Sequence, residues 1–437
     1  MKSTSNKIFF PSVENYEVTA EFADESVSSD GGILLLREID KKLSLTKSIA
    51  ASIPDHRDPT RITHSIQSML QQRIFGLALG YEDINDHNIL RKDPAFQTSV
   101  DRTEILASSS TLCRLEKTAD REMAFSMSKI MVDQFIESFS EKPKKLILDF
   151  DPTDIVTHGE QEDSHYNGYY KHDCFLPLYV YCGEHLLVSY LRTSNADSAK
   201  HGLAILSILV KYLRQHWSDV EIIFRGDCAF GRDHIMSWCE RNNVGYIIGL
   251  SKNSRVMRKV KSLLVRAERD YEITGIKQRL FDQVYYAAKS WKHERKVIIK
   301  AEHNEKGQNP RLIITNVEDL LPQEIYDNGY CKRGDMENRI KEVKLDCKAN
   351  RMSCHQWWSN QFRLLFSSFA YILLSQIRRI ALSNTKFAKA QCSTIRIKLF
   401  KIGAMIIKKA KCIRFILSAH YPDKELFKQI KFAIRSA

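Results

Sequence analysis

The feature that most constrains the fold is the order of short apolar segments between residues 146 and 249. Five of these segments are rich in β-branched and aromatic residues: 146–151, 175–181, 185–191, 220–224 and 244–249. Two others, 198–217 and 231–242, have apolar residues at helical spacing and separate the last three β-prone runs. The order β-β-β-α-β-α-β predicts an α/β fold in which helices pack on the faces of a mixed sheet.

The pattern changes on both sides of this region. Residues 65–79 and 122–138 have helical periodicity, whereas three β-prone runs follow residue 252 before helical patterns return. We therefore expect four segments. They are an all-helical module at 1–140, the first part of the sheet domain at 141–251, a β-rich insertion at 252–325, and a segment at 326–437 that completes the sheet domain and ends in a basic helical region.

The charge of the chain favours a polyanionic partner. Lysine and arginine number 66 and aspartate and glutamate 53, so the formal net charge is +13. Residues 385–437 alone contain thirteen Lys/Arg against two Asp/Glu. Such an excess is typical of a surface that contacts a nucleic-acid backbone, and the alternative is an ordinary solvated helix face. The N-terminal module is the natural candidate for recognising a DNA sequence.

Cysteine usage and hydropathy favour a cytoplasmic protein. The ten cysteines form no C-x-x-C pair and no Cys/His cluster at zinc spacing. Scattered cysteines without a signal peptide are typical of reduced thiols. The most apolar run, 364–377, is too short to cross a bilayer and predicts a buried helix. No membrane association is expected.

The stretch from Tyr330 to Lys344 predicts a charged helix face. At about 100° per residue, Tyr330, Arg333, Glu337, Lys341 and Lys344 lie within roughly 80° of one another on a helix. A core helix would carry apolar residues there. A glutamate among cations can hold a divalent metal while the cations hold phosphates. The alternative is a solvated face with i,i+4 ion pairs, such as Arg333 with Glu337.

Aspartates at the ends of two predicted strands complete a candidate site with Glu337. Asp151 ends the first strand, with Asp149 two residues earlier on the same face, and Asp227 follows the fourth. If those strands are neighbours, Asp151 and Asp227 lie side by side. Three carboxylates suit Mg²⁺ or Mn²⁺, and two such ions about 3.5–4 Å apart could serve phosphoryl transfer. Alone, each aspartate is more commonly a turn former or an N-cap.

Two further groups of residues have a structural and a functional interpretation. The polar cluster Glu82, Asp83, Asp86 and His87 could hold a cation, although capping and inter-helix hydrogen bonds are commoner roles. Trp357 and Trp358 could stack on a base, although core packing is favoured.

These motifs together resemble a known family. Tyr330, Arg333, Glu337 and Lys344 match without a gap the Y-(2)-R-(3)-E-(6)-K (YREK) signature of bacterial insertion-sequence DDE transposases. Within that family the chain resembles the insertion-sequence-1380 group. The stretches that carry this likeness are Asp30-Gly-Gly-Ile-Leu-Leu-Leu-Arg-Glu, Gly80-Tyr-Glu-Asp-Ile-Asn-Asp-His, Leu148-Asp-Phe-Asp-Pro-Thr-Asp, Arg225-Gly-Asp and Arg333-Gly-Asp-Met-Glu-Asn-Arg-Ile-Lys-Glu.

The resemblance implies a ribonuclease H-like fold. It also implies a metal-dependent enzyme that cleaves DNA at the ends of its element and joins the 3′-hydroxyl to target DNA. Double-stranded DNA is then the partner, a homodimer on DNA the expected assembly, and the nucleoid the place of action. A nuclease without strand transfer and an inactive DNA-binding descendant are the alternatives.

The resemblance assigns roles residue by residue. Its catalytic metal ligands correspond to Asp151, Asp227 and Glu337, which would hold two Mg²⁺ or Mn²⁺ ions. Its phosphate-gripping groups correspond to Tyr330, Arg333 and Lys344, and the adjacent Lys341 shares their helix face. Asp149 competes with Asp151 for the first position. Asp151 is preferred, because its spacing to Thr153 fits the family better.

Overall fold

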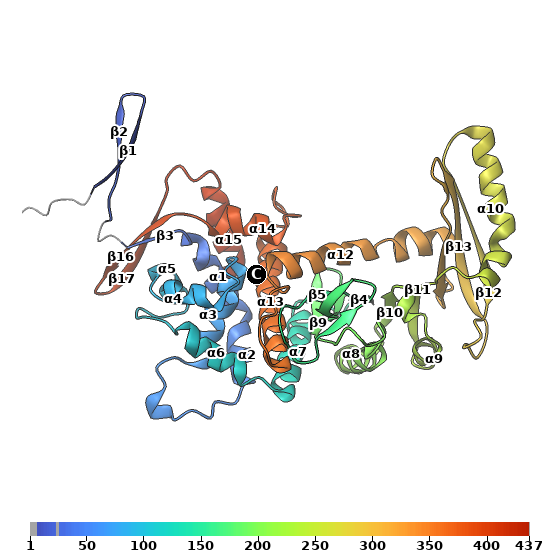
Figure 1. Ribbon diagram of the computed structural model, residues 1–437, viewed down its shortest axis with the longest axis horizontal. Coiled ribbons are helices and arrows are strands. Elements are labelled where there is room, and N and C mark those ends of the chain that lie inside the picture. The colour runs from blue at the N-terminus through green and yellow to red at the C-terminus, as the bar shows by residue number, and fades with distance from the viewer. Residues whose placement is uncertain (1–6, 23–25, 437) are drawn as a thin grey trace, which may run out of the picture.

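The computed structural model of the protein describes residues 7–22 and 26–436, and its central element is a nine-stranded mixed sheet (Figure 1). The strand order is β12-β13-β15-β11-β10-β4-β8-β9, and the short β14 pairs with β13. These strands are β4 (Lys145–Pro152), β8 (Leu178–Cys182), β9 (His185–Tyr190), β10 (Glu221–Gly226), β11 (Val244–Gly249), β12 (Gln278–Tyr286), β13 (Arg295–Asn304), β14 (Gly307–Gln308) and β15 (Arg311–Thr315). The predicted mixed α/β sheet is confirmed.

The two faces of the sheet differ in chemistry because successive side chains of a strand point to opposite sides. Strands β4, β10 and β11 are parallel neighbours. On one face, apolar residues such as Leu148 and Phe224 form a core with α8 (Gly202–His216), α9 (Asp233–Arg241) and α10 (Ser254–Thr274). The opposite face carries Asp149, Asp151 and Arg225, with a small apolar cluster farther along.

The insertion continues the main sheet. Its strands β12, β13 and β15 extend the sheet beyond β11 and place the insertion at one end of the molecule (Figure 1). The β-rich expectation missed the 21-residue helix α10, which packs on β12 and β13. The buried residues of α10 recur at helical spacing, as Val256, Val260, Leu264 and Ala267.

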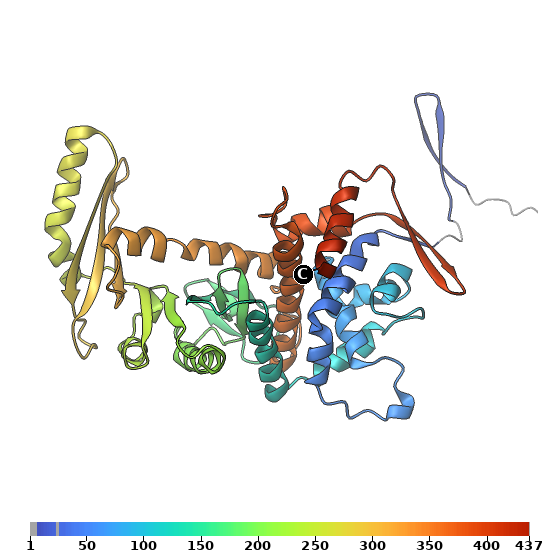
Figure 2. The same cartoon turned by 180° about the vertical axis from the view of Figure 1, so that it is seen from behind.

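The N-terminal helices and the C-terminal region share one hydrophobic core. At its centre lies α13 (Trp357–Ile377), which contacts α1, α3, α6, α7 and β9 (Figures 1 and 2). The N-terminal helices are α1 (Leu34–Leu43), α2 (Leu45–Ala51), α3 (Ile66–Ala78), α4 (His87–Leu90), α5 (Pro94–Ser99), α6 (Ser109–Lys117) and α7 (Arg121–Glu137). The division into four segments stays a prediction.

The helical segment Trp357–Leu382, which is α13 and the π-helical turn after it, is the one helix among the described residues that is long and apolar enough to cross a membrane, although the apolar run 364–377 alone is too short. Its apolar window is 83% buried inside the protein, as expected for a core helix. Trp357 packs edge-to-face on Phe175, and both Trp357 and Trp358 lie against the shared core. The predicted buried helix and the packing role of the two tryptophans are confirmed.

The expectations of an all-helical N-terminal module and a helical C-terminal tail are wrong in part. Residues 8–20 form the hairpin of β1 (Ile8–Val13) and β2 (Tyr16–Ala20), and β3 (Val27–Ser28) is a further short strand. Residues 404–417 form β16 (Ala404–Lys409) and β17 (Cys412–Leu417), and β3 pairs with β16. Burial alternates along β17, where Ile413, Phe415 and Leu417 are half-buried and the residues between them are exposed, as expected for a strand with one covered face. Helices α14 (Cys392–Ile395) and α15 (Lys424–Ser436) flank this hairpin.

The helix that carries the charged stripe is interrupted. It consists of α11 (Pro322–Glu324), a π-helical turn at Ile325–Tyr330, α12 (Arg333–Lys341) and a second π-helical turn at Glu342–Asp346. A π-helical turn has a different angular step per residue from an α-helix, so the stripe is not uniform along its length. Helix α12 runs past β4 and β10 (Figure 1) and contacts β4.

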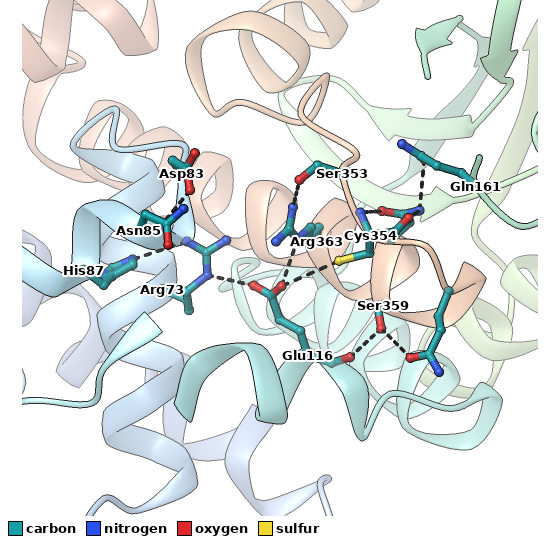
Figure 3. Close-up of polar contacts among 12 residues, drawn as sticks. Arg73, Asp83, Asn85, His87, Glu116, Gln161, Ser353, Cys354, Ser359 and Arg363 are labelled. Atoms are coloured by element: carbon teal, nitrogen blue, oxygen red, sulfur yellow. Dashed lines mark hydrogen bonds and ion pairs between the residues drawn. The ribbon is translucent and has the colours of Figure 1, made fainter. Parts of the chain in front are cut away.

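Buried polar contacts join the N-terminal helices to the start of α13 (Figure 3). Glu116, which is 1% exposed, accepts from Arg73 of α3 at 2.9 Å and from Arg363 of α13 at 2.8 Å. His87 is buried beside Arg73, and Asp83 forms a capping box. The structural interpretation of the cluster around His87 is therefore confirmed.

Three short strands follow β4 along the chain. Strands β5 (Ile155–Val156), β6 (His165–Asn167) and β7 (His172–Phe175) form a small sheet of their own after β4.

Gly32 provides a test of the contact between the two ends of the chain. A Cβ added at Gly32 would lie 1.9 Å from the carbonyl oxygen of Leu399, so Gly32→Ala should lower the unfolding free energy by about 3 kcal/mol or more. Gly334→Ala is the control, because its Cβ meets open space in a helix and should raise stability by about 0.5–1 kcal/mol. Chemical denaturation measures both. Equal stabilities of the two variants would contradict the close contact.

Candidate active site

Two of the predicted carboxylates lie side by side at the ends of neighbouring strands. In the parallel pairing of β4 with β10, Asp149 is opposite Arg225 and Phe150 is opposite Gly226. The next residues are Asp151, at the end of β4, and Asp227, just after β10. This alignment is the one that the sequence predicts.

Helix α12 contributes the third carboxylate. The Nη2 atom of Arg333 lies 2.6 Å from Oδ1 of Asp151, and its Nη1 atom lies 3.0 Å from Oε1 of Glu337. One guanidinium therefore bridges a carboxylate of the sheet and a carboxylate of the helix. The predicted i,i+4 pair between Arg333 and Glu337 forms, but Arg333 also reaches the sheet, so the stripe is not merely a solvated face.

The position of Asp151 is electrostatically unfavourable for a carboxylate. Burial raises the pKa of Asp151 to about 6, the ion pair with Arg333 opposes this rise, and the negative charges of Asp227 and Glu337 add to it. The side chain of Asp151 is only 14% exposed, whereas that of Glu337 is 49% exposed. Negative charge is thus concentrated where a cation would be stabilising.

A cleft of about 370 Å³ opens beside these groups. Its lining includes Asp151, Glu337, Lys341 and Lys344. Lys344 donates to Asp154 at 2.9 Å, and Asp154 also lies 3.1 Å from His172. Four of the predicted site residues therefore line one cavity, and Arg333 contacts two of them, Asp151 and Glu337.

Asp227 and Tyr330 face other neighbours. Asp227 accepts the backbone N–H of Ala229 at 2.9 Å and caps a short 3₁₀ turn. Tyr330 is half-buried over the end of β11, where a Cβ added at Gly249 would lie 2.7 Å from its hydroxyl oxygen. Tyr330 therefore does not share the cleft with Lys341 and Lys344, although it lies close to the backbone at Asp227.

The chemistry of the donors, rather than their spacing in this structure, suits a hard divalent cation. Within residues 7–22 and 26–436, no three His, Cys, Asp or Glu side chains lie close enough together to hold a metal. Asp151, Asp227 and Glu337 are nevertheless oxygen donors at one end of the sheet. Burial is the main cause of the raised pKa of Asp151, and the charges of Asp227 and Glu337 add to it. These residues would hold the ion, and the contact of Arg333 with two of them is the feature that opposes it.

Arg225 is the important residue that sequence reasoning missed. Its guanidinium makes a bidentate pair with Asp149, with Nη2 at 2.6 Å from Oδ2, and also donates to the carbonyl oxygen of Gly329. Both side chains are almost fully buried. Because Asp149 is occupied by Arg225, Asp151 is the aspartate of β4 that faces Glu337. A charged residue within an apolar strand, in register with an aspartate, was the available signal.

Removal of one partner of this buried pair should be costly. Asp149→Asn leaves the Arg225 guanidinium buried without its counter-charge, and we expect the unfolding free energy to fall by about 3–5 kcal/mol. Urea denaturation measures this loss. Glu221→Gln is the control, because its ion pair with Lys145 joins the same two strands but is exposed and should contribute less than about 1 kcal/mol. Similar losses in both variants would contradict the assigned importance of the pair.

The raised pKa of Asp151 predicts a pH-dependent stability difference. The pKa is about 6 in the folded protein against an ordinary value of 3.8, so between these values the folded state binds more protons than the unfolded state. The unfolding free energy of the wild type then falls as pH rises, which Asp151→Asn avoids. As the pH rises from about 4 to about 7, the unfolding free energy of Asp151→Asn should therefore increase by about 2 kcal/mol relative to that of the wild type. A constant difference in urea denaturation would contradict this prediction.

Comparisons with known proteins identify a family relationship. The sequence model of the family described as "Transposase DDE domain group 1" matches residues 10–437. Among solved structures, the fold is similar to a cryo-EM structure of the piggyBac transposase synaptic complex with hairpin DNA. That similarity has a TM-score of 0.40 and 10% identity, and it covers 86% of this chain and 82% of the other. No curated protein matches the chain.

Proposed function

Since the chain belongs to the family of transposases with a DDE domain of group 1, we propose that it binds the ends of its own insertion sequence and transfers them to target DNA. The proposed reaction is metal-dependent cleavage of a DNA strand, followed by attack of the 3′-hydroxyl on a phosphodiester of the target. Asp151, Asp227 and Glu337 are the proposed catalytic carboxylates.

The observation that carries this proposal is the meeting of Asp151 and Glu337 at one guanidinium, beside the end of β10 where Asp227 lies. Carboxylates from two adjacent strands and one helix would provide oxygen ligands for Mg²⁺ or Mn²⁺. Such ions activate the attacking oxygen and stabilise the leaving oxygen in phosphoryl transfer. Burial, together with the nearby charges of Asp227 and Glu337, raises the pKa of Asp151, and this supports a site suited to cations.

The cations around the cleft suit the phosphate backbone of DNA. Lys341 and Lys344 line the same cavity as Asp151 and Glu337. Arg333 contacts both of these carboxylates. Phosphoryl transfer depends on placing the phosphate and on neutralising its developing charge. We propose that Arg333, Lys341 and Lys344 hold the DNA near the bond to be broken, and that Tyr330, at the end of a π-helical turn, packs beside Asp227.

Finer features of the proposal rest on the sequence motifs. The strand order β9-β8-β4-β10-β11 supports a ribonuclease H-like core, and the motifs around Glu337 support the insertion-sequence-1380 group and its YREK signature. The net charge of +13 supports DNA as the partner. We further propose a homodimer on DNA, because two element ends must be joined in one reaction.

The proposal predicts that Glu337→Gln abolishes strand cleavage without abolishing DNA binding. With Mg²⁺ and a DNA carrying the element ends, cleavage should fall about a hundred-fold or more. Gel assays measure nicked and joined products separately, and binding is measured by electrophoretic mobility. Glu318→Gln is the matched control, because Glu318 is an exposed glutamate that does not line the cleft.

Three results distinguish this proposal from its alternatives. Equal cleavage by the wild type and Glu337→Gln would remove Glu337 from the site. Nicked products without joined products would indicate a nuclease. DNA binding without metal-dependent cleavage by the wild type would indicate an inactive descendant.

A further inference from the structure

Arg333 is the cation that stands between the proposed metal ligands. Its guanidinium contacts Asp151 at 2.6 Å and Glu337 at 3.0 Å, so it occupies oxygen atoms of two of the three carboxylates. Arg333 is 15% exposed and Asp151 14%, so the contact between these two side chains is internal, whereas Glu337 is 49% exposed.

We propose that Arg333 is an internal counter-ion that blocks divalent cations from the carboxylate site until a DNA phosphate draws the guanidinium away. This inference rests on the proposed function and adds a coupling between its two ligands. Arg333 has one set of anionic partners in the protein alone and a different one in the DNA complex. Binding of DNA and binding of the divalent cation then favour each other.

Charge and geometry explain why Arg333 would exchange its carboxylate partners for a phosphate. A divalent cation on Asp151 would face the positive charge of Arg333 at the same oxygen atoms, so the two cations compete. Displacing Arg333 without another anion leaves a mostly buried guanidinium uncompensated, which is costly. A phosphate is the suitable replacement, because it presents several oxygens to the planar fork of an arginine.

The resting contact of Arg333 is incomplete. Within the described part of the chain, its buried Nε atom has no hydrogen-bond partner, while Nη1 and Nη2 each contact a carboxylate. A buried donor without an acceptor is unfavourable. A phosphate that accepts from the Nε and Nη2 edge would satisfy this donor, so Arg333 would gain a hydrogen bond on exchange.

The position of the cleft explains how DNA would reach Arg333. Lys341 and Lys344 line the cleft together with Asp151 and Glu337, the two partners of Arg333. Attraction of the backbone to these lysines would place phosphates beside the guanidinium. Because coupling between two ligands is reciprocal, the divalent cation should also strengthen DNA binding by the same factor.

The test measures Mn²⁺ affinity in the absence of DNA, by electron paramagnetic resonance of the free ion. We expect Arg333→Gln to bind Mn²⁺ about ten-fold more tightly than the wild type, because the competing charge is gone. Arg339→Gln is the matched control. Arg339 lies on the same helix, is 20% exposed and also pairs with two carboxylates, those of Glu184 and Glu342, but it does not contact Asp151 or Glu337.

Two further variants test whether the tighter Mn²⁺ binding occurs at the proposed carboxylate site. Asp151→Asn combined with Arg333→Gln should lose the gain, since it removes a ligand of the proposed site. Arg333→Lys keeps the charge but cannot bridge two carboxylates with a planar fork, and should give an intermediate affinity. Arg333→Lys also provides a measurement if Arg333→Gln does not fold, which thermal unfolding would reveal.

The outcomes separate this inference from the proposed function. Equal Mn²⁺ affinities of the wild type, Arg333→Gln and Arg333→Lys would overturn the counter-ion role, even if the wild type cleaves DNA. Tighter Mn²⁺ binding that survives in the double variant would also overturn it, because the ion would lie elsewhere. Failure of the wild type to cleave DNA would count against the proposed function alone.

Discussion

The buried pair of Arg225 and Asp149 is the interaction on which the site depends. It joins the two strands that end in Asp151 and Asp227, and its third bond reaches the carbonyl oxygen of Gly329, just before α12. The same guanidinium therefore aligns the strand ends and sets where the Glu337 helix begins. A buried charge pair is a poor source of stability but an effective source of geometric specificity, since it tolerates few alternative arrangements.

The hydrogen bond from Arg225 to Gly329 forms because the helical segment before α12 packs closely on the sheet. A Cβ added at Gly329 would lie 2.9 Å from Cδ1 of Ile247, and one added at Gly249 would lie 2.7 Å from the Tyr330 hydroxyl oxygen. Both glycines allow backbone to approach where a side chain would intervene. The π-helical turn at Ile325–Tyr330 lies at this approach, and α12 can then extend over the ends of β4 and β10.

Local sequence patterns predicted the parts of the fold that depend on one periodicity. The strands of the sheet and the adjacency of Asp151 and Asp227 followed from apolar runs and their order. Helix α10 was missed, although Val256, Val260 and Leu264 recur at helical spacing, because the neighbouring β-prone runs dominated the interpretation. The double role of Arg333 could not be predicted from the helix alone, since its second partner, Asp151, is 182 residues away.

The charges at the cleft explain why DNA and a divalent cation should bind together. Arg333 is engaged with Asp151 and Glu337, and Lys344 with Asp154, so the cations and carboxylates already compensate one another. A phosphate that bound alone would draw Arg333 away and leave the carboxylates of Asp151 and Glu337 without a counter-charge. A divalent cation alone would place two positive groups at the same oxygen atoms. When DNA and the divalent cation bind together, every cation again has an anionic partner. A site of this kind therefore favours activation by DNA over activation by metal alone.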